Sequence, residues 1–431
     1  MATDAARGGS DPVRLVLLGA LVGIPAALVG ALFLAFVHVL EGWLWEDLPD
    51  ALGRSSPPWY LVVGLPMAGA LVVAAARRFL PGDGGHDPLE GMSATPTPPS
   101  HAPGIALAAV GTLGFGLVLG PEAPVIALGS AVGLAITRRA HLDERGTAVL
   151  ATAGSFSAIS ALFGGPLVAG VLLVESGLAM GAALLPLLVP GFVAAAVGYV
   201  VFTGFGDWGG LDSPGLVVPD LPLYDGVELG DLALAVAVGM ATALALVPIR
   251  SLARRLEGGG ARWGMTRLLI AGGVAVGVLA QVGVWWGIDS HDVLFSGQAS
   301  VPAVVAEGSA ATIAAMVALK AIAYAVSLGC GFRGGAIFPA IFLGIGLASL
   351  AVVWFDASPT WAIAVGAAAG TAAETRLMVA PLLLSALLVG TAGLDTAPAA
   401  VLAAASAWTV TAAFDQRLDP GPGTDPGTAA A

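Results

Sequence analysis

One acidic residue stands inside an almost wholly apolar stretch of the chain. Residues 113–133 read LGFGLVLGPEAPVIALGSAVG, with Glu122 between Pro121 and Pro124. Because a carboxylate is costly in membrane-like surroundings, acids in such segments are rare unless they serve a function. The alternative is a glutamate that only caps the N-terminus of a helix. The apolar context favours the functional interpretation.

The segment around Glu122 predicts a break between two helices. Gly120 and Pro121 end the preceding apolar segment, and residues 125–136 then read as a new short helix. Its first turn contains Pro124, where a missing N–H costs little. The unpaired N–H groups and the positive dipole end of this helix would point toward Glu122 and form an anion site. A carboxylate at such a site acts as a tethered competitor for the ion.

The composition indicates a polytopic membrane protein. Of 431 residues, 57% are hydrophobic and only 11% are charged, and the mean hydropathy is +0.90. In a soluble domain, roughly a quarter of the residues are charged. The formal net charge of −12 comes from acids in hydrophilic loops and in the tail, so no nucleic-acid partner is indicated. Cys330 is the only cysteine, which excludes an intrachain disulfide, and no cluster has metal-ligand spacing. We expect no metal and no cofactor.

Apolar stretches that could cross or enter a membrane recur along the chain. They cover residues 15–40, 57–76, 104–119, 147–180 with a break at 164–166, 184–202, 232–247, 268–286, 310–328, a segment restarting as a helix at Pro339, 361–373, 377–390 and 398–413. We therefore divide the chain into a polar N-terminal segment (1–12), a first membrane repeat (13–202), an acidic loop (203–231), a second membrane repeat (232–414) and a disordered tail (415–431).

Charged loops suggest the orientation in the membrane. The loops at residues 138–145 and 250–267 are basic, so the positive-inside rule predicts that they face the cytoplasm. The acidic loop lacks Lys and Arg and is predicted to face the other side. The first span is too long for a cleaved signal peptide and is expected to be retained.

Two interrupted segments occupy corresponding places in the two halves. The first is GPEAP at residues 120–124, and the second is GGAIFP at residues 334–339. Paired breaks of this kind point to an inverted-repeat transporter whose binding site lies between the repeats.

From about Val13 to Phe414, the chain resembles the CLC family of chloride channels and proton-coupled chloride antiporters. Residues 120–124 keep the Gly, Glu and Pro of the family's glycine-arginine-glutamate-glycine-proline motif, and residues 335–339, GAIFP, match the frame of its second filter segment. The stretches LFGGPLVAGVLLVES and MVAPLLLSALL are also similar to family helices. The resemblance implies an all-α polytopic membrane protein with the CLC-type fold, in which many tilted and broken helices form two inverted repeats. It also implies a homodimer with one pore per subunit.

The resemblance assigns roles to the residues at the two breaks. Glu122 corresponds to the gating glutamate, which occupies the outer anion site and swings away when it is protonated. Backbone N–H groups near Glu122 and Ala123, and those of Ala336, Ile337 and Phe338, would bind the anion. Helix N-termini hold an anion without a fixed cation that would trap it.

Three departures from the family pattern bear on the mechanism. In the best match to the first filter segment, GGHDP at residues 84–88, Gly85 stands where the family has its ion-binding serine. Phe414 lies in roughly the region of the family's pore tyrosine but cannot donate a hydrogen bond. The ungapped match also places Ser176 at the position of the antiporters' internal proton-transferring acid, with Glu175 beside it. If Glu175 does not substitute for that acid, the protein behaves as a passive channel.

The leading hypothesis is therefore anion (chloride) transport across the membrane in a channel-like mode. The alternative within transport is a proton-coupled antiporter of chloride, another halide or nitrate. A non-conducting structural or regulatory membrane protein is an alternative of another class. An intramembrane metalloprotease is disfavoured, because no H-E-x-x-H motif is present and no His accompanies Glu122. Expected partners are chloride or a related anion, protons in the antiporter, and the lipid bilayer of a bacterial-type plasma membrane.

Other polar residues near the breaks have competing interpretations. Lys320, inside a span, either attracts anions toward the pore or snorkels or pairs with an acid. Arg333 is expected in an aqueous mouth, where it would raise the local anion concentration. His86 and Asp87 are interpreted as a local turn rather than a titratable element.

Overall fold

The computed structural model describes residues 11–91, 95–140, 142–178, 181, 184–204, 209 and 216–418. Within these residues, eight helical stretches are long and apolar enough to cross a membrane. Outside the helices, the described residues contain a single isolated β-bridge, which joins Gly120 to Gly335. The expectation of an all-α polytopic membrane protein is confirmed.

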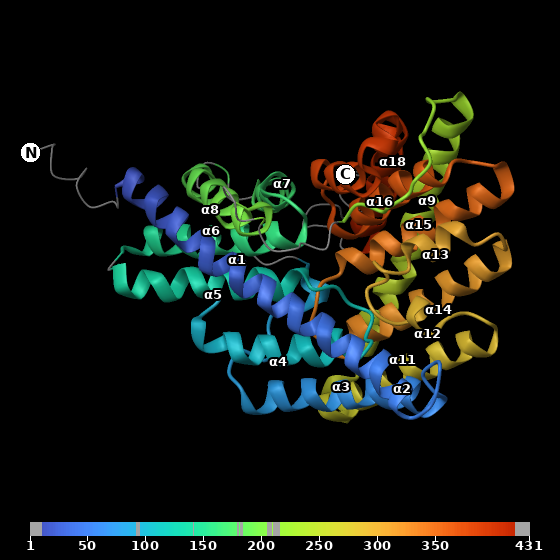
Figure 1. Cartoon of the computed structure of the whole chain (residues 1–431), viewed down its shortest axis with the longest axis horizontal. Helices are drawn as coiled ribbons and strands as arrows, with labels where there is room; N and C mark the ends of the chain where they lie inside the picture. Colours follow the sequence, from blue (N-terminus) through green and yellow to red (C-terminus); the bar gives the residue numbers. More distant parts are fainter. Residues whose placement is uncertain are drawn as a thin grey trace, which may run out of the picture.

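The helices of the two halves lie side by side (Figure 1). In the first half they are α1 (Pro12–Gly42), α2 (Leu48–Ala51), α3 (Trp59–Phe79), α4 (Ala102–Leu113), α5 (Glu122–Ala140), α6 (Glu144–Leu162), α7 (Pro166–Ser176) and α8 (Leu185–Thr203). In the second half they are α9 (Leu229–Glu257), α10 (Gly260–Trp263), α11 (Met265–Trp285), α12 (Ser290–Val293), α13 (Val301–Ala306), α14 (Ala310–Gly329), α15 (Ile337–Phe355), α16 (Pro359–Thr375), α17 (Val379–Val389) and α18 (Ala397–Leu418).

Three boundaries at the breaks differ from the sequence predictions. The short helix predicted over residues 125–136 is α5, which begins at Glu122 and continues to Ala140. Pro124 permits this earlier start, because a proline in the first turn has no preceding helical carbonyl to clash with. The span predicted over residues 104–119 is helical only to Leu113. The restart predicted at Pro339 occurs at Ile337.

The predicted break at residues 164–166 separates α6 from α7, as expected. At the other end of the chain, α18 continues to Leu418, past the predicted end of the second repeat at Phe414. Residues 419–431 of the predicted tail, residues 1–10 of the N-terminal segment, and Asp207 and Asp212 of the acidic loop lie outside the described residues.

The helix that follows each break packs closely against the next helix in sequence. A Cβ atom added to Gly129 of α5 would lie 2.4 Å from the carbonyl oxygen of Gly154 in α6. In the second half, a Cβ atom on Gly344 of α15 would lie 2.1 Å from the carbonyl oxygen of Gly366 in α16. Small residues let membrane helices approach in this way, and both halves use the same solution.

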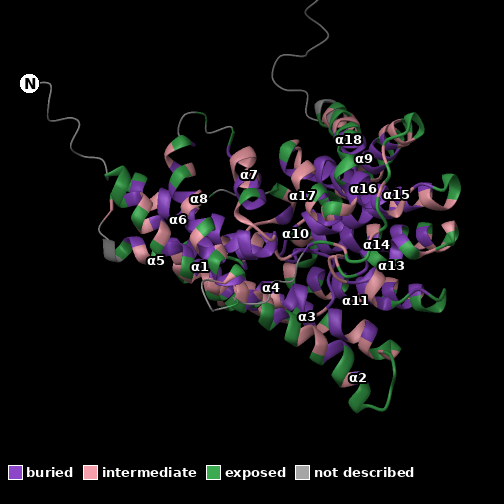
Figure 2. Cartoon of the chain, turned by 45° about the horizontal axis from the view of Figure 1, so that its top comes forward, coloured by how far each residue is buried: buried purple, intermediate pink, exposed green. Residues whose placement is uncertain are grey.

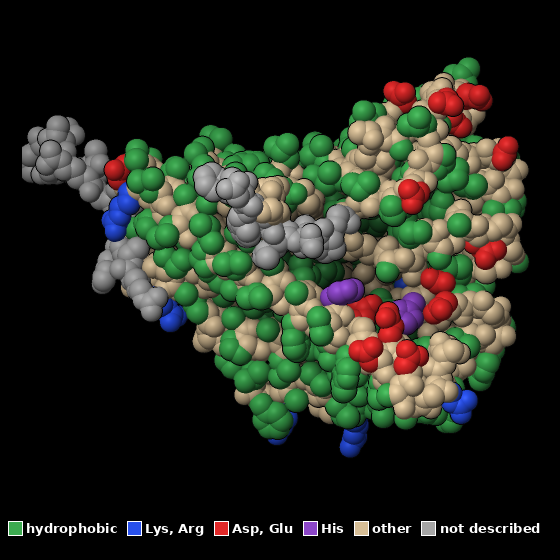
Figure 3. Space-filling view, viewed as in Figure 1, with side chains coloured by type: hydrophobic (Ala, Val, Ile, Leu, Met, Phe, Trp, Pro, Cys, Tyr) green, Lys and Arg blue, Asp and Glu red, His purple; other side chains and the backbone are tan. Residues whose placement is uncertain are grey.

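The most buried part of the molecule surrounds α14, α15 and α16 (Figure 2). In the most apolar part of α15, 72% of the residues are buried, compared with 39% in the most apolar part of α3. The helix that begins at the second break is therefore largely enclosed by protein. On the face seen in Figure 3, acidic side chains gather over the right half, where Figure 1 places the start of α9 and the α12 region. Basic side chains lie toward the left and lower edges of this face.

Candidate anion site

The two broken segments meet inside the protein. Gly120 and Gly335 exchange backbone hydrogen bonds of 2.7 and 2.6 Å. Leu117, Val118 and Leu119, just before the first break, are all fully buried. Irregular backbone at membrane depth is tolerated only where it is buried in protein or lines a cavity. The bridge therefore satisfies the backbone at the point where the repeats join.

One face of α14 supports both breaks. The Tyr324 hydroxyl donates to the carbonyl of Ala336, the residue before α15, at 3.0 Å. One turn further along, the Ser327 hydroxyl accepts a hydrogen bond from the Val118 N–H at 3.0 Å. Both side chains are fully buried. A single helix thus positions the backbone on both sides of the Gly120–Gly335 bridge.

Lys320 on the same helix also donates hydrogen bonds to backbone carbonyls. The sequence predicted instead that it attracts anions, or that it snorkels or pairs with an acid. Its Nζ donates to the carbonyls of Leu294 at 2.6 Å and Phe295 at 3.3 Å, and it lies 4.7 Å from the centroid of the Phe342 ring. The Phe295 N–H in turn donates to the Gly116 carbonyl. Lys320 is fully buried and does not line the cavity at Glu122. Its contacts make it a positioning residue for the segment before Glu122.

Glu122 lies at the N-terminus of the opposing helix. Its side chain is buried, and its Oε1 accepts a hydrogen bond of 2.6 Å from the backbone N–H of Ile337, the first residue of α15. The backbone N–H groups of Phe338 and of Glu122 itself also stabilise the carboxylate. Oε2 is buried and has no hydrogen-bond partner among the described residues. The carboxylate therefore occupies the kind of position at which a helix start binds an anion.

Two glycines leave the room that this carboxylate fills. A Cβ atom on Gly335 would lie 2.0 Å from Cδ of Glu122, and a Cβ atom on Gly120 would lie 2.0 Å from Oε2. Real Cβ atoms do not approach other atoms so closely. Neither glycine has a positive φ, so the requirement for glycine comes from the space taken by Glu122 and not from the backbone.

A cavity of about 630 Å³ connects Glu122 with charged side chains near the ends of several helices; we name it the vestibule. Ala123, Ala336 and Ile337 line it beside Glu122. Its other lining residues include Glu90, Glu175, Arg250, Arg254, Glu374, Arg376 and Asp415. Arg250 and Arg254 belong to the basic segment for which the sequence predicts a cytoplasmic position. The vestibule would then lead from the cytoplasm to Glu122.

The Phe338 side chain packs among mostly apolar side chains. Phe338 stacks on Phe163 with ring centroids 5.8 Å apart and an angle of 20° between the planes. Phe338 also lines a small cavity of about 10 Å³ together with Leu216 and Gln298. A single water needs at least roughly that volume. Of the predicted anion-binding residues, Phe338 therefore has its side chain in this small cavity and does not line the vestibule.

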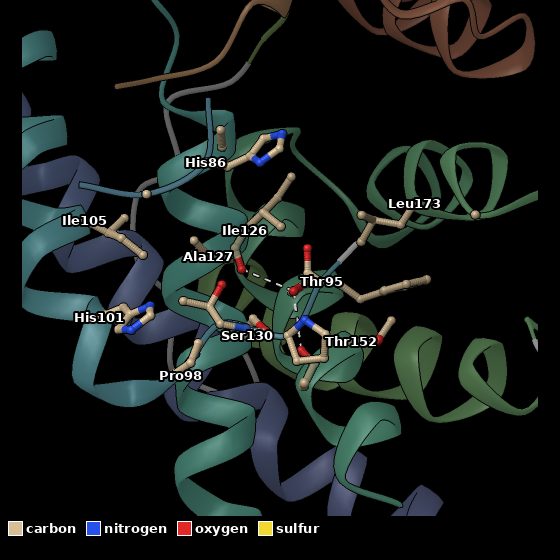
Figure 4. Close-up of a pocket in the computed structure, with 18 of the residues that line it drawn as sticks. His86, Thr95, Pro98, His101, Ile105, Ile126, Ala127, Ser130, Thr152 and Leu173 are labelled. Carbon is tan, nitrogen blue, oxygen red and sulfur yellow. Dashed lines mark hydrogen bonds between the residues drawn. The ribbon is translucent and has the colours of Figure 1, made fainter. Parts of the chain in front are cut away.

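Gly85 lies in a different cavity from Glu122. This second cavity, of about 270 Å³, is lined by Gly85, His86 and Thr95, and it shares Ala123 with the vestibule. Figure 4 shows His86 at one end and the hydroxyl-bearing Thr95, Ser130 and Thr152 together further along. The structure thus brings Glu122, Ala123, Ala336 and Ile337 together and leaves Gly85 apart.

The expectation that Arg333 lies in an aqueous mouth is wrong. Arg333 is only 5% exposed, and its guanidinium pairs with Asp83 at 2.8 Å and Asp87 at 2.7 Å. Asp87 also accepts a hydrogen bond from the Leu89 N–H and caps the short turn Pro88–Glu90, which agrees with the predicted local turn. Arg333 therefore fastens the segment that contains Gly85 to the second break.

Glu175 caps a helix of the other half. The backbone N–H groups of Met378, Val379 and Ala380, at the start of α17, all donate to its carboxylate. The first N–H groups of a helix lack partners within the helix, and a carboxylate there is favourable. Both carboxylate oxygens are engaged in these contacts.

We expect Glu175→Ala to lower the stability of the purified protein by about 1–2 kcal/mol, because three amides lose their acceptor. Glu175→Gln keeps one acceptor oxygen and should cost less. Thermal unfolding in detergent measures both. A Glu175→Gln variant of unchanged stability that no longer moves protons would instead return Glu175 to the proton pathway.

Glu374 and the role of Tyr324 were missed by the sequence analysis. The predicted span of residues 361–373 stops just before Glu374, although the acid follows the same kind of small, apolar run that singled out Glu122. Its partner Arg250 is 124 positions away in the sequence. The acid itself was visible in the sequence, but its pairing was not.

In this protein, broken helices from two membrane repeats begin close to one buried acid. This arrangement is typical of a class of ion-transporting membrane proteins. The comparisons identify the family. Residues 68–412 match the sequence model described as "Voltage gated chloride channel", and the chain belongs to this family, the CLC family. It is an integral multi-pass membrane protein and a CLC-type anion transporter, not an enzyme.

Relatives and solved structures agree with this assignment. The chain is 29% identical over 345 residues to the "Putative ion-transport protein YfeO" of Escherichia coli K12 (DH10B) and of Shigella boydii serotype 4, covering 76% of this chain and of each relative. A slow cyanobacterial Cl⁻/H⁺ antiporter matches with a TM-score of 0.72 and 16% identity, covering 94% of this chain and 98% of the antiporter chain. A CLC-type fluoride/proton antiporter matches with a TM-score of 0.71 and 18% identity, covering 93% and 96%. The predicted CLC-type fold is confirmed.

Proposed function

We propose that Glu122 gates the passage of chloride or a related anion through this protein. The supporting observation is the 2.6 Å hydrogen bond from the Ile337 N–H to the Glu122 carboxylate, in a cavity lined by Arg250 and Arg254. The carboxylate competes with the anion for the amides at the start of α15. When Glu122 is protonated it loses its charge, leaves these amides and makes room for the ion.

The anion would be bound mainly by backbone groups. Gly85 lines a separate cavity, and the Tyr324 hydroxyl donates to the Ala336 carbonyl. The amides at the start of α15 therefore supply the donors that can face the ion. Such a site holds an anion without a permanent positive charge, which favours both entry and release.

We further propose that the anion is exchanged for protons. The sequence favoured a channel because Ser176 takes the position of the antiporters' internal acid. Two observations support exchange instead. The vestibule contains a second buried acid, Glu374, and two solved structures of similar fold are described as Cl⁻/H⁺ and fluoride/proton antiporters.

Purified protein in chloride-loaded liposomes tests both proposals. We expect chloride to leave the liposomes down its gradient and to drive protons the opposite way, measured with a chloride electrode and an internal pH dye. Chloride flux without proton movement would reject exchange and leave gating intact. Absence of flux for every halide and for nitrate would reject transport by this chain and favour a structural or regulatory role.

We also propose a homodimer in a bacterial plasma membrane. The family resemblance implies the dimer, and curated relatives from Escherichia and Shigella support the bacterial membrane. Cross-linking of the purified protein in detergent tests the dimer, and a monomer at all concentrations would reject it.

A further inference from the structure

A second buried carboxylate shares the vestibule with Glu122. Glu374 lies near the C-terminal end of α16, is 7% exposed and lines the same cavity. It is close enough to interact electrostatically with Glu122. Two acids buried in one membrane cavity are unfavourable, because each resists the charge of the other and both lose hydration. Their presence together suggests a function that needs both.

Arg250 binds only part of the Glu374 carboxylate. Its Nη1 donates to Oε1 of Glu374 at 2.9 Å and to the backbone carbonyl of the same residue at 3.0 Å, while Nη2 donates to the Leu89 carbonyl at 3.4 Å. Oε2 of Glu374 is buried and has no hydrogen-bond partner among the described residues. An ion pair that serves only stability normally satisfies both oxygens. Here one oxygen is left to accept a proton.

We propose that Glu374 is the internal proton-transfer acid of this transporter, taking protons from vestibule water and passing them to Glu122. This inference rests on the proposed function, in which Glu122 gates the anion site. Ser176 cannot transfer protons as an acid does, and the carboxylate of Glu175 is engaged by the start of α17. Glu374 on α16 thus supplies, from the second repeat, a proton-transferring acid in place of the one that Ser176 replaces on α7.

One passage along this route moves one proton and no electrons. The Glu374 carboxylate binds a proton from vestibule water and releases it, through water in the same cavity, to the Glu122 carboxylate. The neutral Glu122 leaves the Ile337 N–H, and an anion takes its place. Arg250 stabilises the negative charge that remains on Glu374 after the proton has left. Glu122 then loses its proton on the far side and returns to the amides as a carboxylate, which displaces the anion into the vestibule, so that one proton and one anion have moved in opposite directions.

The charged surroundings of Glu374 come from both repeats. The titratable or charged side chains that line the vestibule or interact with Glu374 are Glu90 ahead of α4, Glu122 on α5, Glu175 on α7, Arg250 and Arg254 on α9, Tyr324 on α14, Arg376 after α16 and Asp415 on α18. Glu175 is capped by α17, and Arg376 pairs with Asp415 at 2.7 Å. Among these acids, Glu122 and Glu374 each retain a buried oxygen without a described hydrogen-bond partner.

The test measures chloride and proton movement together in liposomes containing Glu374→Gln. The Gln side chain can still accept a hydrogen bond from Arg250, so the fold should persist. We expect chloride flux to continue, though not at the wild-type rate, and chloride-driven proton movement to fall at least about tenfold, as for loss of a proton-transfer group. Glu175→Gln is the matched control from the same cavity and should keep the wild-type proton-to-chloride ratio. A wild-type ratio in Glu374→Gln would overturn the proposal.

A second variant keeps the proposal testable if Glu374→Gln does not fold. The double variant Arg250→Gln, Glu374→Gln removes both charges together and leaves no buried charge unpaired. As for Glu374→Gln, we expect chloride flux to continue while proton movement falls at least about tenfold, and a wild-type proton-to-chloride ratio would overturn the proposal. Wild-type protein that carries chloride but no protons would also overturn the role of Glu374, while the gating role of Glu122 would stand on its own test. Wild-type protein that carries no anion would reject the proposed function itself.

Discussion

Glu122→Gln is expected to carry chloride at a rate that no longer follows pH. In the wild-type protein, the negative carboxylate competes with the anion for the Ile337 N–H, and protonation removes this competition. The amide of Gln has no charge at any pH, so it competes equally weakly throughout. Flux should therefore rise above the wild-type rate at neutral pH and vary by less than about twofold between about pH 5 and pH 7.5. Proton movement should fall at least about tenfold, because Gln cannot carry a proton.

Chloride efflux from liposomes at a series of pH values measures this effect. Glu122→Asp is the matched variant, because it keeps a titrating group on a shorter side chain and should retain a pH response. Glu175→Gln removes an acid from the same vestibule without touching the amides of α15, so it should respond to pH as the wild type does. A Glu122→Gln variant whose flux still follows pH like the wild type would show that another group is the gate.

Sequence reasoning located the breaks well because their signals are local. Gly and Pro interrupt long apolar runs at residues 120–124 and 334–339, and an acid is conspicuous in such surroundings. These local signals alone predict Glu122 and a helix start close to that of α15. The exact helix start was less predictable, because a proline fits any position of the first turn and therefore does not fix which residue begins the helix.

The errors concern residues whose partners are distant in the sequence. Arg333, just before the second break, was expected in an aqueous mouth, but Asp83 and Asp87 reach it from the first repeat. Lys320 was expected either to attract anions or to snorkel or pair with an acid, whereas the groups to which it donates hydrogen bonds are backbone carbonyls. A composition or spacing argument cannot identify carbonyl partners, because every residue has one. The tertiary fold decides these cases.

The same reasoning separates Glu175 from Glu374, two of the acids that line the vestibule. Glu175 was the candidate for proton transfer because it lies next to the position at which antiporters have their acid. Its three amide contacts come from α17, more than 200 positions later in the chain. Glu374 lies at a helix end where a cap or a surface charge would be expected. The packing of α9 and α16, which brings Arg250 to it, makes it a buried acid.

Gly335→Ala is expected to open the gate without changing any titratable group. The added Cβ would lie 2.0 Å from Cδ of Glu122, so the carboxylate must leave its position on the Ile337 N–H. Losing a hydrogen bond to a charged group costs about 1.5–3 kcal/mol, which corresponds to a shift of about 10- to 100-fold toward the displaced gate. Chloride flux at neutral pH should rise, and its pH dependence should become shallow. Liposome flux measures both effects.

The double variant Glu122→Ala, Gly335→Ala separates a displaced gate from a damaged fold. Glu122→Ala removes the atoms with which the new Cβ collides, so Gly335→Ala should add little to its flux, whereas independent effects would add. Gly64→Ala in α3 is the control for a glycine in an apolar span, since a Cβ atom there would meet nothing within 4 Å. If Gly335→Ala lowers flux to the same extent with and without the Glu122 carboxylate, the substitution has disrupted the Gly120–Gly335 bridge. The change in flux then does not come from a collision with the carboxylate. If the effect depends on Glu122, the glycine at this break is required by the gate that folds back against it.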